Sequence, residues 1–313
     1  AVYLGGEIFV LIASSKNFTF EEMKVGIDFA HKYDAKVYLT LNIIPHNSDI
    51  NKLKEYLLNV RDLNFDAVIV ADPGILMYVK KYWPEVEIHL STQANNTNYE
   101  SAKFWHDQGV KRVILARELS LNEIKEISKK TPESLELEAF IHGAMCISYS
   151  GRCLLSNYMA NRDSNRGACA QPCRWNYSLV EKTREGEYFD VYEDERGTHI
   201  FNSRDMNLIK KVPELIESGL SSLKIEGRMK SIYYVSNIVR TYRDAIDKYY
   251  KEKSNFEFND KWLEELEKSS HRKYTEGFIE GNPGEDGQVY DSSSYIRTYD
   301  FIGIVKSYDE KSK

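Results

Sequence analysis

The chain has 313 residues, 42% of them hydrophobic, and a formal net charge of −6 at pH 7, which is enough apolar material for one large core and a small satellite domain. No run approaches the roughly 20 apolar residues of a membrane span and no basic, cleavable leader opens the chain, so we expect a cytoplasmic protein without membrane contact. The negative charge excludes a broad electrostatic coat for nucleic acid, and an RNA site is therefore expected to be a local patch.

Short β-rich runs recur along the chain, with helical patterns between most of them. Two helical patterns begin with capping boxes, Thr19-x-x-Glu22 and Ser120-x-x-Glu123, in which side chains bond otherwise unpaired amides. This alternation predicts parallel βα units. A (β/α)8 barrel of the TIM type is the preferred fold, and a doubly wound open sheet is the alternative. The strands are expected at 2–4, 36–41, 67–71, 87–90, 112–116, 137–141 and 222–226.

Polar residues accumulate where these strands end. In a barrel, the carboxyl ends of the strands form the mouth that carries the active site. Alternation along a strand is expected to put Glu138, Phe140 and His142 on one face. By the same rule, the side chains at 224, 226 and 228 share a face of the last strand. The residues delivered to the mouth are Asn42, Asp72, Thr92, Gln93, Arg117, Glu118, His142, Glu226 and Arg228.

The βα rhythm breaks after residue 141 for about 80 residues, which we interpret as an insertion at 143–220 within a catalytic domain of residues 1–250. Within it we expect a hairpin at 176–201 with its turn at 193–197, and a short helical unit at 202–219 in which Pro213 is an irregularity. A helix at 230–250 carries a broad apolar stripe that is expected to pack into the core. Residues 251–270 are expected to be a polar linker, and the Gly-punctuated residues 271–313 the start of a small β domain.

All four cysteines of the chain lie within one 28-residue stretch, in the frame Cys146-x6-Cys153-x15-Cys169-x3-Cys173. Such a compact foursome indicates the ligands of one metal centre rather than a disulfide framework. Zinc sites usually show two tight Cys-x2-4-Cys pairs, and the first spacing is too wide for one. An iron–sulfur cluster tolerates irregular spacing and is therefore favoured. Zinc, and four buried thiols without a metal, remain alternatives.

The cysteine segment is locally basic. Between Cys146 and Trp175 there are four arginines and one aspartate, a local charge of +3 in an acidic chain. Arginine suits phosphate and carboxylate groups, and aromatic rings in the same segment offer faces for an unstacked base. The alternative is that the arginines brace the loop or neutralise bound thiolates. The charged residues are Arg152, Arg162, Asp163, Arg166 and Arg174, and the rings belong to Tyr149, Tyr158, Trp175 and Tyr177.

One long run carries a family resemblance. Residues 138–156 (EAFIHGAMCISYSGRCLLS) resemble the signature of peptidase family U-32, the collagenase-like peptidases. The match is supported by five shorter motifs: STQAN at 91–95, LARELS at 115–120, NRGACAQPCRW at 165–175, NSRD at 202–205 and KIEGR at 224–228. Family members usually begin with a further strand and helix and continue into a longer terminal β domain. The resemblance therefore implies that this chain lacks the first barrel strand and carries a truncated β domain, and that residues before Ala1 exist in the natural protein.

The resemblance is strongest to the bacterial branch of the family that hydroxylates the wobble uridine of tRNA to 5-hydroxyuridine. It implies an iron–sulfur cluster, most simply [4Fe-4S], on the four cysteines, prephenate as cosubstrate, the tRNA anticodon loop as substrate, and a second family subunit or a homo-oligomer as partner. His142 and Glu226 are the candidates for proton transfer. The candidates for substrate binding are Gln93, Arg117, Arg152, Arg166 and Arg228.

Simpler roles stay open for these residues. His142 alone is compatible with a structural cap, and Glu226 with an ion pair to Arg228. A collagenase-like peptidase is the first functional alternative, although the sequence has no His-Glu-x-x-His and no Gly-x-Ser-x-Gly motif. A Cys146–His142 pair would leave three thiols unexplained. A noncatalytic RNA-binding protein with a structural zinc is the second alternative.

Overall fold

The central element is a curved, mostly parallel β-sheet. The computed structural model describes residues 1–9, 17–175, 203–283 and 295–300, with short pieces at 193–194, 197–198, 287, 302–303 and 307. Six strands pair in chain order and in parallel: β1 (Val2–Leu4), β2 (Val37–Leu41), β3 (Ala67–Val70), β4 (Glu87–Leu90), β5 (Arg112–Ile114) and β6 (Glu136–Ala144). A seventh, β10 (Ser222–Ile225), pairs in parallel with β6. All seven predicted strands are confirmed.

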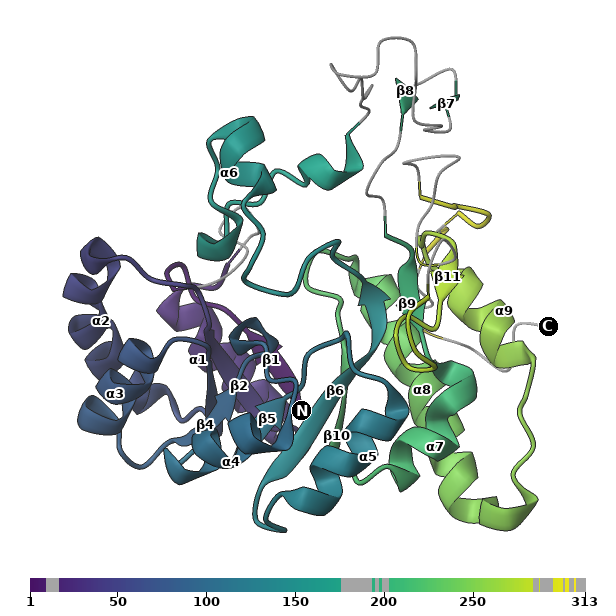
Figure 1. Ribbon diagram of the computed structural model, residues 1–313, viewed down its shortest axis with the longest axis horizontal. Coiled ribbons are helices and arrows are strands. Elements are labelled where there is room, and N and C mark those ends of the chain that lie inside the picture. Colours follow the sequence, from purple (N-terminus) through teal and green to yellow (C-terminus); the bar gives the residue numbers. More distant parts are fainter. Residues whose placement is uncertain are drawn as a thin grey trace.

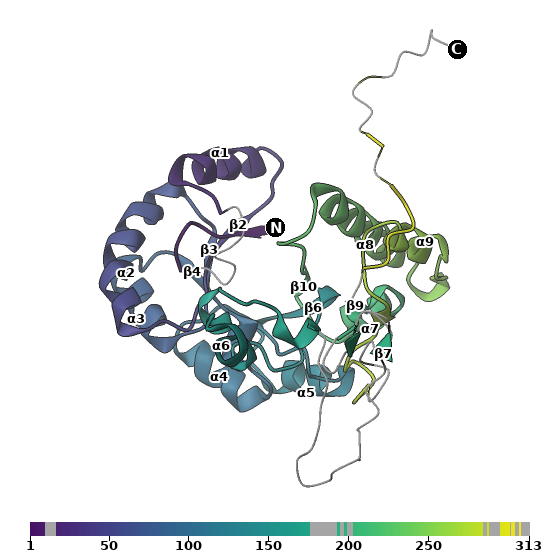
Figure 2. The same ribbon diagram turned by 90° about the horizontal axis from the view of Figure 1, so that it is seen from above.

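Helices follow most of these strands and lie outside the curve of the sheet (Figures 1 and 2). They are α1 (Phe20–His31), α2 (Asn47–Val60), α3 (Pro73–Tyr82), α4 (Tyr99–Asp107), α5 (Leu121–Lys130), α7 (Val212–Glu217) and α8 (Ile232–Glu252). Both predicted capping boxes are present, at Thr19 and Ser120. The described strands keep chain order without the reversal of a doubly wound sheet, so the chain is an α/β protein with helices wrapped around one sheet.

Apolar side chains fill both faces of the sheet. The larger cluster lies between strands and helices and includes the fully buried Leu39, Leu57 and Val113. A smaller cluster of Tyr38, Ala67, Ile69 and Ile114 fills the inside of the curve. The inner cluster shows that the strands converge around packed side chains.

The two edges of the parallel arc meet through a side chain. The Tyr3 hydroxyl on β1 lies 3.4 Å from the Ile225 carbonyl oxygen, at the end of β10, and 3.0 Å from Glu226 Oε2. Among the described residues, no backbone ladder joins β1 to β10. In the view from above, the ring of helices is open between α1 and α8 (Figure 2).

Several predictions between 202 and 283 are wrong. Part of the expected helical unit is instead strand β9 (Asp205–Asn207), antiparallel to the end of β6, and β11 (Tyr274–Thr275) pairs with β9. The main sheet therefore includes residues assigned to a separate β domain. Pro213 is no irregularity, because it lies in the first turn of α7, where a missing amide costs no hydrogen bond.

The predicted linker at 251–270 contains helix α9 (Lys261–Glu267), whose Trp262 and Leu266 are buried against the core. In the predicted hairpin, β7 (Glu193–Asp194) pairs antiparallel with β8 (Gly197–Thr198). The rest of that hairpin lies outside the described residues.

The apolar stripe of α8 is only half buried, contrary to expectation. Ile238 and Tyr242 pack in the core, whereas Val235 is 38% exposed and Val239 47% exposed. Phe29 of α1 is likewise exposed. These exposed faces belong to the two helices that flank the opening in the ring (Figure 2), so no described element covers them. Within the described part of the chain, no helix is both long enough and apolar enough to cross a membrane.

Candidate active site at the carboxyl ends of the strands

The cysteine loop crosses the carboxyl ends of the strands and is fastened there by side chains. Arg117 donates from Nη1 to the Ala144 carbonyl oxygen (2.8 Å) and from Nη2 to Ser150 Oγ (2.9 Å). Asn95 donates to the Ser150 carbonyl oxygen. Gly151 has φ +72°, and a Cβ there would lie 2.7 Å from Gln93 Oε1, so glycine permits the close approach. Gln93 and Arg117, predicted to bind substrate, therefore lie against the loop.

The middle of the loop is tied to the other side of the sheet. The Ile44 amide donates to the Asn165 carbonyl oxygen at 2.9 Å. Arg166 makes a two-pronged ion pair with Asp49 of α2, at 3.1 Å from Nε and 2.7 Å from Nη2. Burial alone would raise the pKa of Asp49, but Arg166 and the backbone of His46 lower it overall. This geometry matches the bracing alternative for Arg166.

The four thiols are free and close enough to influence one another. Cys146 and Cys169 are exposed, and Cys153 and Cys173 are half-buried. Burial raises the pKa values of Cys169 and Cys173, and the charges of the other thiols raise them further. The Gln171 amide donates to Cys169 Sγ at 3.3 Å. Within the described residues, no group of three or more Cys, His, Asp or Glu side chains is arranged to hold one metal ion.

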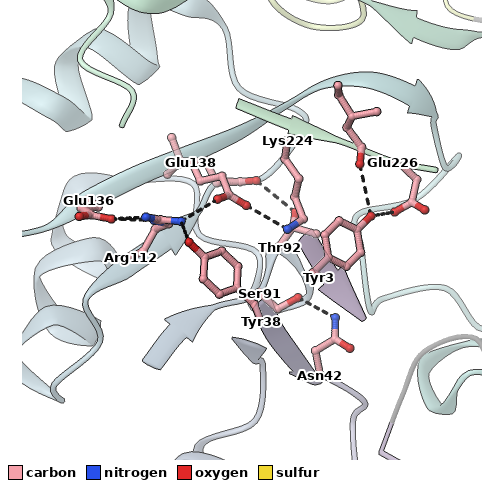
Figure 3. A network of polar contacts seen from close by, with 12 residues as sticks. Tyr3, Tyr38, Asn42, Ser91, Thr92, Arg112, Glu136, Glu138, Lys224 and Glu226 are labelled. Atoms are coloured by element: carbon pink, nitrogen blue, oxygen red, sulfur yellow. Dashed lines mark hydrogen bonds and ion pairs between the residues drawn. The ribbon is translucent and has the colours of Figure 1, made fainter. Parts of the chain in front are cut away.

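A buried ionic network ties the strands together inside the curve (Figure 3). Glu138 is 3% exposed and receives a hydrogen bond from Lys224 Nζ at 3.0 Å and from Arg112 Nη1 at 3.4 Å. Arg112 also donates from Nε to Glu136 at 2.7 Å. Burial would raise the pKa of Glu138, but Lys224 and Arg112 hold it below its usual value. The network links β5, β6 and β10, and Glu138 remains ionised.

Glu226 is held at the end of β10 by two neighbours. The Tyr3 hydroxyl donates to Oε2 at 3.0 Å, and the Arg228 amide donates to Oε1 at 3.0 Å. The Arg228 guanidinium donates from Nη2 to Asn17 Oδ1 at 2.6 Å. Gly143 has φ +113°, and a Cβ there would lie 2.5 Å from the Glu226 carbonyl oxygen. The end of β6, from which the cysteine loop leaves, thus packs directly on Glu226.

His142 does not share the face expected for it. It is 1% exposed, its ring packs against Tyr234, Tyr242 and Tyr274, and its Nδ1 lies 3.4 Å from the Tyr242 hydroxyl. The cause is a bulge: Lys224 pairs with Phe140, but the next residue of β10 pairs with His142, so one residue of β6 is skipped. Burial lowers the pKa of His142 to about 3, helped by Lys230 and His271, and the imidazole is neutral at neutral pH.

The remaining arginines of the loop differ in their surroundings. Arg152 is exposed. Arg162 donates to the Ala168 carbonyl oxygen at 2.9 Å, and Arg174 to the Met145 carbonyl oxygen at 3.5 Å. Sequence reasoning missed Tyr3 as a partner of Glu226, because two residues 223 positions apart leave no local signal.

Comparisons with known proteins found one family model and several similar relatives. The family model described as peptidase family U32 matches residues 1–288. The chain is 45% identical to the "tRNA hydroxylation protein P1" of Bacillus subtilis (strain 168), over all of this chain and 74% of that protein. It is 40% identical to the "tRNA hydroxylation protein P" of Escherichia coli (strain K12), over 93% of this chain and 72% of the relative. It is also 38% identical to the "Uncharacterized protease MJ0090" of Methanocaldococcus jannaschii, over 100% of this chain and 76% of the relative.

Proposed function

This chain belongs to peptidase family U32, and we propose that it is a tRNA hydroxylase of that family. The observation that carries the proposal is the 45% identity, along the whole chain, to a protein named for tRNA hydroxylation. The four-cysteine loop fastened over the strand ends by Arg117 and Asn95 provides a place for the chemistry. The substrate we propose is the wobble uridine, which is converted to 5-hydroxyuridine with prephenate as cosubstrate.

The structure favours hydroxylation over peptide hydrolysis. A thiol protease needs an imidazole within hydrogen-bond reach of its cysteine. His142 is instead enclosed by three tyrosine rings. Cys146 is exposed, with Arg117 as its charged neighbour. The peptidase alternative is therefore the weaker one.

The four thiols suit an iron–sulfur cluster better than zinc. Four thiolates on one zinc ion lie roughly 4 Å from each other. Here the thiols interact electrostatically, and the Cys146-x6-Cys153 spacing is wider than the Cys pairs usual at zinc sites. A cluster with separated iron corners accepts wider spacing, and the amide of Gln171 on Cys169 and the nearby Arg117 and Arg174 would stabilise its negative charge. A bound cluster supplies one-electron chemistry.

The chain's own residues would then bind and orient the substrates. Glu226 lies at the mouth of the sheet, where the Tyr3 hydroxyl and the Arg228 amide orient its carboxylate. This carboxylate is our candidate for accepting a proton from the substrate. His142 is a neutral imidazole whose Nε2 has no partner among the described residues. The target base must leave its stack to reach such a site. Arg152, exposed on the loop, is positioned to meet a phosphate.

The finer fold that we propose is a (β/α)8 barrel. Seven parallel strands in chain order, an inner cluster of packed side chains, and edges β1 and β10 bridged by Tyr3 support it. An eighth strand between β1 and β10 would complete the sheet, and its helix would cover the exposed faces of α1 and α8.

The decisive experiment is mass spectrometry of tRNA nucleosides from a strain that lacks the gene. The wild-type gene should restore 5-hydroxyuridine, and a Ser replacement at any of the four cysteines should lower both the iron content of the protein and the modified nucleoside. A strain whose tRNA keeps its full 5-hydroxyuridine without the gene would rule the proposal out. Loss of activity for Cys146→Ser alone would revive the thiol-protease alternative.

Substitutions at Arg152 and Arg166 distinguish an arginine that contacts RNA from one that only braces the loop. Arg152→Gln should make the log–log salt dependence of tRNA binding shallower by about one, because one phosphate contact is lost. Arg166→Gln should leave that slope unchanged and lower stability by roughly 1 kcal/mol, because Asp49 loses its partner. Equal slopes for wild type and Arg152→Gln would remove Arg152 from the RNA interface.

A further inference from the structure

A second polar group lies outside the network of Figure 3 and is built on β9 and the segment that follows α9. Asp205 is 1% exposed and Arg272 is 2% exposed. Arg272 donates from its backbone amide to Oδ2 of Asp205 and from Nη1 to Oδ1, both at 3.1 Å. Lys230 Nζ lies 3.8 Å from Asp205 Oδ2. One buried carboxylate therefore faces two cations.

Tyr295 lies against both cations. Arg272 Nη2 donates to its hydroxyl at 2.9 Å, and the guanidinium lies 4.5 Å from the ring centroid. The Lys230 ammonium lies 4.1 Å from the same centroid. Burial alone would raise the pKa of Tyr295, but Arg272, Lys230 and Arg174 hold it below its usual value. The phenol thus lies in a positive potential that Asp205 does not cancel.

The charges in this group are unbalanced. Lys230 and Arg272 supply two positive charges and Asp205 supplies one negative charge, an excess of one, while Arg174 lies beside the thiols. Glu226, another carboxylate near Tyr234, is already held by Tyr3 and the Arg228 amide. Buried cations normally have anionic partners, so this group is short of negative charge.

Donors in the group also lack acceptors. Arg272 Nε and the Tyr234 hydroxyl are buried and have no hydrogen-bond partner among the described residues. The Lys230 ammonium makes one long hydrogen bond, 3.4 Å to the Ser270 carbonyl oxygen, and lies 4.9 Å from the centre of the Tyr234 ring. Lys230 also immediately precedes the N-cap of α8, a 21-residue helix whose N-terminus adds positive potential. The excess positive charge and the unpaired donors of Arg272 and Tyr234 are both features expected of an oxyanion-binding site.

We propose that Lys230, Arg272 and Tyr295 form a binding site for a carboxylate of a small acid, beside the cysteine loop. Arg272 interacts electrostatically with Arg174 and Cys173, which indicates that the site lies near the thiols. A small molecule is favoured over RNA, because a phosphate on a polynucleotide would have to reach an arginine that is 98% buried by the protein. The identity of the acid rests on the proposed function, whose cosubstrate prephenate carries two carboxylates.

The test is calorimetric titration of the anaerobically purified 313-residue chain with prephenate. Lys230→Gln should weaken binding at least tenfold, since a charge-assisted contact is lost. Tyr295→Phe removes only a hydroxyl and should weaken binding severalfold. Arg240→Gln is the matched control, because it removes an exposed positive charge elsewhere on α8, and it should bind as the wild type does.

Three results would overturn the proposal: no prephenate binding by iron-replete wild type, unchanged binding by both site variants, or loss of iron in proportion to loss of binding. The last result would mean that the cations serve the cysteines. Hydroxyuridine in tRNA, measured separately in the complemented deletion strain, tests the proposed function itself. A wild-type protein that restores the nucleoside and binds prephenate, with binding unchanged in both site variants, would overturn only this inference.

Discussion

Acid should destabilise the fold through His142. Folding lowers the pKa of this buried imidazole from about 6.5 to about 3, so between these values the unfolded chain binds a proton that the folded chain does not. The stabilisation is therefore fully present above about pH 6.5 and is lost as the pH falls below it. For a single group with these pKa values, lowering the pH from 7.5 to 5.5 costs about 1.4 kcal/mol of unfolding free energy.

The measurement is urea denaturation at the two pH values, followed by circular dichroism. Other groups also titrate in this range, so the comparison is with His142→Gln, which cannot protonate. Its loss of stability between the two pH values should be smaller than that of the wild type by about 1.4 kcal/mol. His106→Gln, at a histidine on α4, serves as the control and should keep the wild-type pH dependence. Equal pH dependence in wild type and His142→Gln would refute the reasoning.

Two further substitutions test how the strands are joined. Lys224→Met should lower the unfolding free energy by about 3 kcal/mol, because the buried Glu138 loses its nearest cation and Arg112 reaches it only at 3.4 Å. A combined change with Glu138→Gln should recover part of that loss, and no recovery would argue against an electrostatic cause. Gly143→Ala should cost more stability than Gly109→Ala in the same denaturation assay. Both glycines have positive φ, but only at 143 does the new Cβ meet the Glu226 carbonyl oxygen, so equal costs would show that this contact relaxes freely.

The parallel strands could be predicted because each is a short, strongly apolar run bounded by helical patterns. The strands β9 and β11 could not, since Asp205–Asn207 and Tyr274–Thr275 do not form apolar runs. The bulge that turns His142 away from its expected face is equally invisible, because it depends on how β10 pairs with β6.

The candidate site could likewise be predicted only in part from the sequence. The cysteines were found from their spacing, and the local positive charge from composition. That Arg166 braces the loop follows from Asp49, 117 residues earlier. The group around Lys230 combines Asp205 of β9 with Arg272 and Tyr295, which are far from Lys230 in the sequence. Only the folded chain brings these residues together. Residues that lie close together in the sequence could be assigned a chemical role, whereas contacts between distant residues could not be predicted.

The two-sided attachment of the cysteine loop has a consequence for biosynthesis. Its anchors Ile44, Asp49 and Asn95 are translated before the first cysteine, so one side of the loop can dock while the chain is still being made. Arg272, which interacts electrostatically with Cys173, is translated about 100 residues later, or several seconds later at typical elongation rates. The attachments of the cysteine loop can therefore form one after the other, with the side near Arg272 completed last.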